Sequence, residues 1–279
     1  MSASPSKLKK PRYALITGAG SGLGREFCLQ LGRLGWHLAV TDTDLVAAER
    51  THAEIVAIGS SGQVELLDVT QRDAWQRLVD RLQHEWPRLD LLVNNAGVCG
   101  TGKVGSPSDD QFGHIFDVNF QGTLNGCQAM IPWLRSTAPG GCIVNVASIF
   151  GLVAPPTMAA YNCSKAAVVA LSETLYGELR PHGIGVTVVA PGFFDSQLVE
   201  RGHFASDEDR HVAKQYVANS KITAEDVVRV ALSAANKGQL YTVLGRKARW
   251  IWRLKRLLPA RFARIIAWRY RRKINQADD

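Results

Sequence analysis

Short apolar runs alternate with longer amphipathic segments along this 279-residue chain. The apolar runs predict strands at 13–17, 37–41, 63–67, 90–93, 142–147, 184–190 and 240–243. Apolar residues at helical spacing predict helices at about 23–34, 44–58, 71–85, 108–135, 159–180 and 224–236. Such alternation predicts a mostly parallel sheet with helices on both faces, because the crossovers between parallel strands are right-handed. We expect one doubly wound α/β domain over residues 11–245.

A glycine-rich turn follows the first predicted strand, with the sequence Thr17-Gly-Ala-Gly-Ser-Gly-Leu-Gly24. Its spacing is Gly18-x-x-x-Gly22-x-Gly24, which differs from the common G-x-G-x-x-G pattern. A strand, a glycine turn and a helix start together form an anion site, because backbone N–H groups and the positive helix end face a phosphate. The alternative is an ordinary glycine-rich connection.

Tyr161 and Lys165 form a Tyr-x-x-x-Lys pair, and Ser148 lies 13 residues before the tyrosine. The spacing places the phenol and the ammonium group on one helix face, one turn apart. A nearby cation favours the phenolate, which would suit the tyrosine to acid–base work. Ser148 ends a predicted strand and could hold a substrate oxygen. The alternative is a surface tyrosine beside a solvated lysine.

The chain resembles the short-chain dehydrogenase/reductase family at these motifs, at Asn94-Asn-Ala-Gly97, at Asn119 and at Pro191-Gly192. The resemblance spans residues 13 to about 245 and implies a Rossmann-type, NAD-binding catalytic domain. It implies that Tyr161 is the acid–base, that Lys165 lowers the pKa of Tyr161 and binds the nicotinamide ribose, and that Ser148 binds the substrate oxygen. Asn119 would hold a water that links Lys165 to solvent, or would be a helix-kinking amide.

The resemblance also implies a set of cofactor contacts. They are Gly18, Ser21, Gly22, Leu23, Gly24, Asp42, Asp68, Val69, Asn95, Ala96, Gly97, Tyr161, Lys165, Pro191 and Gly192. Asp42 ends the second predicted strand, where an acid binds ribose hydroxyls and repels a 2′-phosphate. Thr43 and Ser21 stand where NADP-dependent members usually carry a basic residue, so we expect NAD rather than NADP. Asp42 could instead only lead the next helix, although Asp44 is the better N-cap candidate, and Asp68 could cap the helix from Gln71.

We expect an oxidoreductase that transfers a hydride between NAD(H) and a lipophilic or secondary alcohol or ketone. Ser148, Tyr161, Phe193 and Phe194 would contact this small substrate, and the segment from Phe193 to about Ser220 would form a mobile lid. We also expect a homodimer or a homotetramer. The alternative is a catalytically idle dinucleotide-binding sensor or scaffold at a membrane surface.

Composition favours a reduced, cytoplasmic protein. The five cysteines are scattered, odd in number and without metal-type spacing, so no metal site is expected. Residues 1–10 are polar and basic, which predicts a flexible N-terminus without a hydrophobic signal core. No apolar run approaches the 18 residues that a spanning helix needs.

The segment from residue 246 to 273 carries twelve lysines and arginines and no acidic residue. The rest of the chain then holds 21 basic and 25 acidic residues, so the net charge of +8 belongs to this tail. Tryptophans at 250, 252 and 268 are interleaved with apolar residues at helical spacing. We expect residues 246–279 to form a basic amphipathic helical tail that attaches to an anionic membrane surface. It could instead pack on the body or across a dimer. Nucleic acid is the least expected partner, because no recognised nucleic-acid-binding motif accompanies the positive charge.

Overall fold

The structure, a computed structural model, describes residues 11–105, 108–194, 202 and 204–275, with side chains up to residue 272. The N-terminal segment expected to be flexible and residues 276–279 of the tail lie outside the described residues. In the described part, seven parallel strands form one sheet in the order β3-β2-β1-β4-β5-β6-β7. They are β1 (Arg12–Thr17), β2 (Trp36–Asp42), β3 (Ser61–Leu66), β4 (Leu91–Asn94), β5 (Cys142–Val146), β6 (Gly185–Ala190) and β7 (Tyr241–Val243). The predicted doubly wound, Rossmann-type sheet is confirmed.

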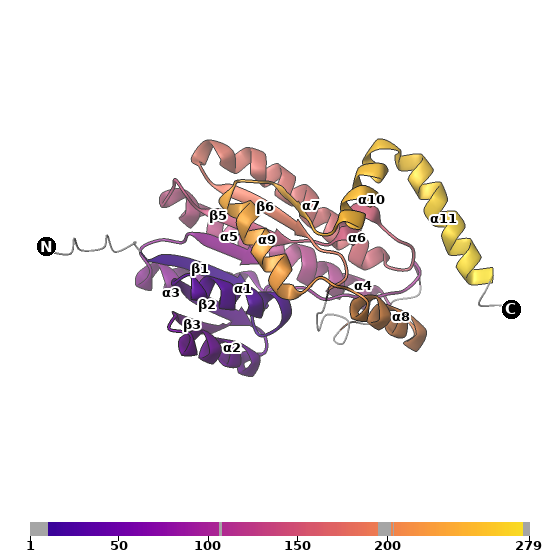
Figure 1. The fold of residues 1–279 in the computed structure, drawn as a ribbon. Helices are drawn as coiled ribbons and strands as arrows, with labels where there is room; N and C mark the ends of the chain where they lie inside the picture. Colours follow the sequence, from indigo (N-terminus) through magenta and orange to yellow (C-terminus); the bar gives the residue numbers. More distant parts are fainter. Residues whose placement is uncertain (1–10, 106–107, 195–201, 203, 276–279) are drawn as a thin grey trace, which may run out of the picture.

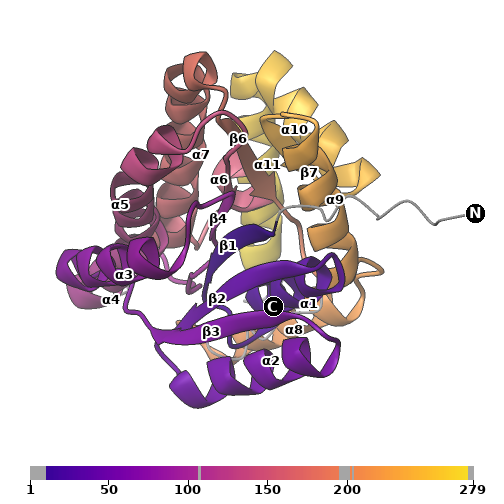
Figure 2. The same ribbon diagram turned by 90° about the vertical axis from the view of Figure 1, so that its left-hand side faces the viewer.

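Helices cover both faces of this sheet (Figures 1 and 2). One face is packed against α1 (Gly22–Arg33), α2 (Leu45–Ala57) and α9 (Ala224–Asn236). The other face is packed against α3 (Arg72–Glu85), α5 (Gly122–Ser136) and α7 (Ala159–Leu179), which a short 3₁₀ turn, η2 (Arg180–His182), follows. Alternate strand residues divide between the two cores: Ala14 and Ile16 face α1, whereas Leu15 faces the opposite side. This division is the period-two pattern of a strand that is buried on both faces.

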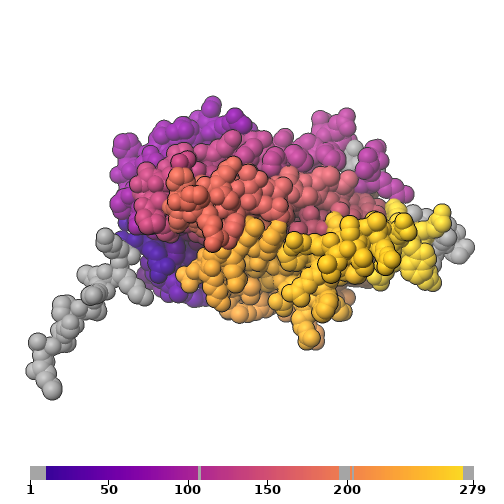
Figure 3. Space-filling view, turned by 90° about the horizontal axis from the view of Figure 1, so that it is seen from above, coloured from indigo at the N-terminus to yellow at the C-terminus, as the bar shows by residue number. Residues whose placement is uncertain are grey.

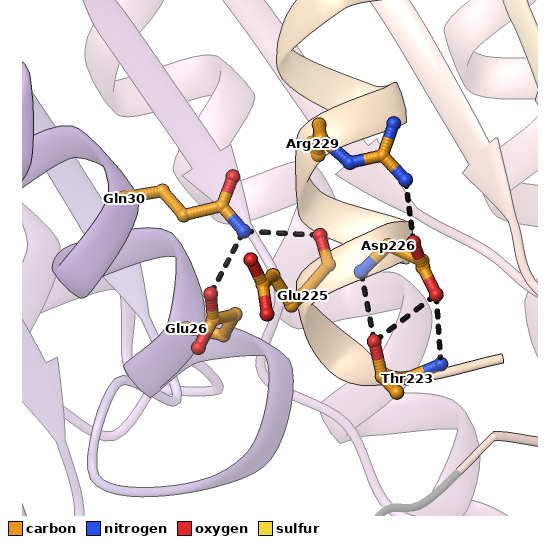
Figure 4. A network of polar contacts seen from close by, with 6 residues as sticks. All are labelled: Glu26, Gln30, Thr223, Glu225, Asp226 and Arg229. Carbon is orange, nitrogen blue, oxygen red and sulfur yellow. Dashed lines mark hydrogen bonds and ion pairs between the residues drawn. The ribbon is translucent and has the colours of Figure 1, made fainter.

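The start of α9 is fixed against α1 by polar contacts at the surface (Figure 4). Thr223 and Asp226 form a reciprocal capping box, in which each side chain accepts a hydrogen bond from the other residue's backbone N–H. Gln30 of α1 donates to the backbone oxygen of Glu225 at 3.0 Å. The capping box satisfies the N–H group of Asp226 in the first turn, and the Gln30 contact joins the start of α9 to α1.

Three parts of the chain differ from the sequence-based prediction. The helix expected over 108–135 consists of α4 (Asp109–Phe116), a π-helical turn η1 (Asp117–Gln121) and α5. A short helix, α6 (Ile149–Val153), follows β5. Within the expected lid, residues 195–201 and 203 lie outside the described residues, but α8 (Asp207–Ala218) is a regular helix. Ser206 caps it by accepting from the N–H of Asp209, a start signal that the mixed charge of this segment concealed.

The basic tail is helical, with α10 (Arg246–Leu257) and α11 (Pro259–Asn275) meeting at an angle at one end of the molecule (Figures 1 and 3). Half-buried Trp252 of α10 packs on the body, where its ring lies 5.1 Å from that of Tyr241. Large apolar side chains on the outer side of the tail stay exposed, among them Leu257 at 77% and Trp268 at 56%. The tail thus combines a packed inner face with an exposed outer face. Among the described helices, none is long and apolar enough to cross a membrane.

Candidate active site

The glycine turn leaves its backbone open at the start of α1. Gly18 and Gly22 both have positive φ, at +61° and +53°, where a side chain would be strained. A Cβ on Gly24 would lie 2.0 Å from the oxygen of Gly18, whereas a Cβ on Gly22 would meet nothing within 4 Å. Ser21 is the N-cap residue of α1, but its side chain accepts no hydrogen bond from the N–H groups of the helix, and the first turn contains no acidic residue. These features fit a phosphate group at this helix end.

The end of β4 is tied directly to this turn. The side chain of Asn95 donates to the backbone oxygens of Thr17 and Gly18, at 2.8 and 3.1 Å. The Thr17 hydroxyl in turn accepts from the backbone N–H groups of Asn95 and Ala96. The Asn-Asn-Ala-Gly segment and the glycine turn therefore form one rigid unit at the point where the strand order reverses, which is where this class of sheet binds ligands.

Asp42 is buried at the end of β2 beside the same turn. Its carboxylate accepts hydrogen bonds from the backbone N–H of Gly20 at 2.8 Å and of Asp44 at 3.0 Å. Asp44 is the N-cap of α2, as the sequence indicated, because its side chain accepts from the N–H of Ala47. Asp42 therefore holds the turn in place and keeps a buried carboxylate beside it.

The segment after β3 borders the other side of this region. Asp68 accepts from the backbone N–H and the hydroxyl of Thr70, at 2.9 and 2.8 Å, so its carboxylate shapes a turn and does not cap α3. Val69 is buried, and a Cβ on Gly122 would meet its side chain at 2.5 Å. Gly97 and Gly192 follow the ends of β4 and β6, and a Cβ on Gly192 would meet nothing within 4 Å.

The long helix α7 carries Tyr161 and Lys165 on one face, and both side chains are buried. The ammonium group of Lys165 lies 6.0 Å from the centre of the Tyr161 ring and donates to the backbone oxygen of Val146 at 2.9 Å. Ser148 is the N-cap of α6, where its hydroxyl accepts from the N–H of Phe150 at 3.2 Å. The Ser148 hydroxyl also lies near Tyr161 and lowers the pKa of its phenol. The structure thus brings together the three residues that the spacing singled out.

Burial controls the charge of both α7 groups. The pKa of Tyr161 is raised above its ordinary value, first by burial and then by nearby Cys99, whose ionised form would repel the phenolate, while the Ser148 hydroxyl lowers it. The pKa of Lys165 falls from 10.5 to about 8, because burial disfavours the ammonium form. The effect that the sequence led us to expect from Lys165 on the Tyr161 pKa stays a prediction.

Asn119 is fully buried in the π-helical turn η1. Its side-chain oxygen accepts from the N–H of Val98 at 2.8 Å, and its side-chain nitrogen donates to the Val98 oxygen and to the Ser164 hydroxyl. Protein groups thus use both amide N–H bonds, so the side chain has none left to donate to the expected water. A π-helical turn often marks a functional position. Here it places the Asn119 amide between the loop that follows β4 and helix α7.

A row of aromatic rings connects Tyr161 with Tyr216 of α8. Phe150 lies edge-on to Tyr161 at 6.4 Å and edge-on to Phe193 at 5.4 Å. Phe193 stacks on Tyr216 of α8 at 4.8 Å with an interplanar angle of 12°. Phe194 instead belongs to the buried core with Val227 of α9, which argues against the substrate contact expected for it.

Sequence reasoning missed several residues around this site. Cys99 and Phe150 pack in one cluster with Tyr161, and Tyr216 extends the aromatic row. Cys99 lies two positions after Gly97 and Phe150 two after Ser148, so proximity to the motifs was the available signal. Tyr216 had no such signal, because the helix that carries it was expected to be a loop.

The short chain dehydrogenase family model matches residues 12–204, which include the glycine turn, Ser148, Tyr161 and Lys165. The chain belongs to the short-chain dehydrogenase family. Among curated relatives of this family, the oxidoreductase EphD of Mycobacterium tuberculosis is 32% identical over 253 residues. That match covers 88% of this chain but 43% of EphD, so the chain spans less than half the length of that relative. A cyclopentanol dehydrogenase of Comamonas sp. is 35% identical over 68% of this chain and 76% of its own length.

Solved structures of short-chain dehydrogenases agree with this assignment. A member from Burkholderia phymatum in complex with NAD has a TM-score of 0.84 and 30% identity, and the match covers 88% of this chain and 93% of that one. A member from Sphingobium yanoikuyae in complex with NADPH has a TM-score of 0.75 and 26% identity, over 91% and 95% of the two chains. Similar proteins thus bind either nicotinamide dinucleotide.

Proposed function

We propose that this chain is a dehydrogenase or ketone reductase that transfers a hydride between NAD(H) and a lipophilic secondary alcohol or its ketone. The observation that carries the proposal is the grouping of Ser148, Tyr161 and Lys165 at the strand ends that also carry the glycine turn. The open backbone at Gly22 and the uncapped start of α1 fit the pyrophosphate of such a cofactor. We place the reaction in the cytoplasm, where the five scattered cysteines would stay reduced.

The side chains of the site would transfer the proton and bind the substrate and the cofactor. The nicotinamide ring, when bound, supplies hydride chemistry at the carbinol carbon. Tyr161 would accept the hydroxyl proton during oxidation and return it during reduction. Ser148 would hydrogen-bond the substrate oxygen, and Lys165 would bind the nicotinamide ribose. Asn119 would act indirectly, since its amide joins the Val98 backbone to Ser164 on α7. With all four residues in place, the site does not favour the idle sensor or scaffold.

The aromatic row supports an apolar substrate. Phe150 contacts Tyr161 directly, Phe193 contacts Phe150, and both residues are partly exposed. A relative at 35% identity is named cyclopentanol dehydrogenase, which is consistent with a small apolar alcohol. A screen of cyclic and acyclic secondary alcohols with NAD, and of the matching ketones with NADH, would test the proposal by the absorbance of the reduced cofactor.

We propose NAD as the preferred cofactor because Asp42 keeps a buried carboxylate beside the glycine turn. Asp42→Asn keeps an acceptor for the backbone of the turn, and exposed Thr43→Arg adds a partner for a 2′-phosphate. The double variant is expected to move the ratio of kcat/KM values about ten- to one-hundredfold toward NADP. Steady-state kinetics with both cofactors measure this shift. A parent protein that already prefers NADP would contradict the role given to Asp42.

We propose that residues 246–273 bind an anionic membrane surface. Residues 246–273 include no acidic residue, and their apolar side chains at Leu257, Leu258, Ile265 and Trp268 are exposed in the structure. Each basic residue near an anionic surface contributes about 1 kcal/mol, an attraction that salt screens. Exposed tryptophan and leucine would anchor the apolar face at the headgroups. The homodimer or homotetramer expected from the sequence stays a prediction.

Liposome co-sedimentation tests this part of the proposal. We expect the intact chain to sediment with anionic vesicles at low salt and to be released at high salt. It should not sediment with neutral vesicles. A chain ending at Leu258 removes α11 but keeps α10, which packs on the body, so it should lose most lipid binding and keep NAD affinity. Equal sedimentation of both chains would show that α11 faces the protein or a second copy.

A further inference from the structure

The short helix α6 carries the catalytic serine at its start, and it is held against α7 on one side. Ser148 caps α6 through the N–H of Phe150, and the N–H of Ile149 bonds to the oxygen of Pro191. A Cβ on Gly151 would lie 2.6 Å from the backbone carbon of Lys165. The backbones of α6 and α7 are therefore in close contact at the level of the catalytic lysine.

The tail helix α10 packs on the other side of α6. Ala248 and Trp252, one turn apart, belong to a cluster with Leu152 and Val153 of α6. The same cluster contains buried Ile149, the residue directly after Ser148. The guanidinium group of Arg256 lies over the Trp252 ring at 5.2 Å. Trp252 is thus the largest tail side chain in the cluster that also holds α6.

The segment around α6 has little stability of its own. A helix of five residues is too short to persist without tertiary packing. The residues that follow include two non-glycine positions with positive φ, Ala154 at +49° and Thr157 at +66°. Such conformations cost about 1–3 kcal/mol each and persist only where the surroundings impose them. The position of Ser148 therefore depends on what packs against α6.

We propose that Trp252 is a positioning residue for the reaction: by clamping α6 against α7, the first tail helix holds the Ser148 hydroxyl against Tyr161. This inference rests on the proposed function for the role of Ser148, but the packing that it invokes does not. The tail would then help to position an active-site residue, and this role is separate from any contact of the outer face of the tail with lipid. Loss of the clamp would let Ser148 move away from Tyr161 and from the substrate oxygen.

The test compares two tryptophans on the same helix. Trp252→Ala removes the clamp, Trp252→Phe keeps most of its apolar contact, and Trp250→Ala is the matched control, since Trp250 is 66% exposed and lies outside the cluster. Hydrogen exchange of residues 148–157 is measured without lipid or substrate. We expect faster exchange of this segment in Trp252→Ala, near wild-type exchange in Trp252→Phe, and no change in Trp250→Ala.

Kinetics supply the second readout. Small displacements of catalytic groups lower the reaction rate strongly. Trp252→Ala should therefore lower kcat about ten- to one-hundredfold, while NAD affinity changes little. The pH at which alcohol oxidation reaches half its maximal rate should also rise, since the nearby Ser148 hydroxyl lowers the pKa of Tyr161. The other titratable groups near Tyr161 are Lys165 and Cys99, and Arg210 lies near Cys99. The Trp252 cluster contains none of them, so they would not produce this shift.

The outcomes separate the inference from the proposed function. Unchanged exchange at 148–157 in Trp252→Ala, or equal changes in both alanine variants, would overturn the clamp even if the enzyme turns over an alcohol. A lower kcat with an unchanged pH profile would also overturn it, because partial unfolding scales the rate at every pH. If no substrate is found but exchange rises only in Trp252→Ala, the clamp stands and the proposed function fails.

Discussion

Replacing Tyr161 with phenylalanine is expected to lower kcat for alcohol oxidation by about 10²–10⁴-fold, the usual loss when a general acid–base group is removed. The substitution deletes one hydroxyl and keeps the ring that packs edge-on against Phe150. Ser148 keeps its cap on the N–H of Phe150, so the fold and NAD affinity should stay close to those of the parent protein. Steady-state kinetics and NADH fluorescence titration measure the two effects separately.

Tyr176→Phe provides the control on the same helix. The Tyr176 hydroxyl accepts a hydrogen bond from Arg180 at the surface, away from the catalytic residues. Its loss should leave kcat within about twofold of the parent value, as expected for a surface substitution. A Tyr161→Phe variant as active as Tyr176→Phe would rule out Tyr161 as the acid–base.

Replacing Lys165 with methionine is expected to stabilise the fold while it abolishes most activity. Burial lowers the pKa of Lys165 from 10.5 to about 8, so the folded protein binds this proton less tightly than the unfolded chain. The resulting cost to folding is fully present below pH 8 and disappears as the pH rises toward 10.5. Methionine carries no charge, so the variant should gain about 1–3 kcal/mol in free energy of unfolding at pH 7, less what the lost hydrogen bond to Val146 costs.

The same variant should lose about ten- to one-hundredfold in NAD affinity, since a charged hydrogen bond contributes about 1.5–3 kcal/mol. Denaturant unfolding at pH 7 and at pH 10 tests the stability claim, and NADH titration tests the binding claim. A variant less stable than the parent at pH 7 would contradict the cost assigned to the buried ammonium group. Unchanged NAD affinity would remove Lys165 from the cofactor site.

The sequence predicted the strand-end motifs well because each has a strong local signal. Gly18, Gly22 and Gly24 stand at positions that only glycine suits, and the four-residue spacing of Tyr161 and Lys165 fixes their shared helix face. The element order followed from the change between two-residue and helical periodicity. These signals sufficed for the sheet and for the grouping of Ser148, Tyr161 and Lys165.

The features that the sequence did not predict depend on packing between segments that are distant in the chain. Nothing local shows that the helix over 108–135 contains a π-turn, which places Asn119 against Val98 and Ser164. The raised pKa of Tyr161 comes first from burial by distant segments, which the four-residue spacing does not show. The tail pattern showed basic, amphipathic helices, but the choice of Trp252 rather than Trp250 as the packed ring depends on α6 and β7.

Isotope transfer tests the central claim most directly. A secondary alcohol that the screen identifies is labelled with deuterium at its carbinol carbon and incubated with NAD, and the NADH formed is analysed by mass spectrometry. The proposed reaction predicts one deuterium in each NADH produced by the parent protein, and very little NADH from Tyr161→Phe. NADH without deuterium, or equal production by the variant, would contradict direct hydride transfer with Tyr161 as the acid–base.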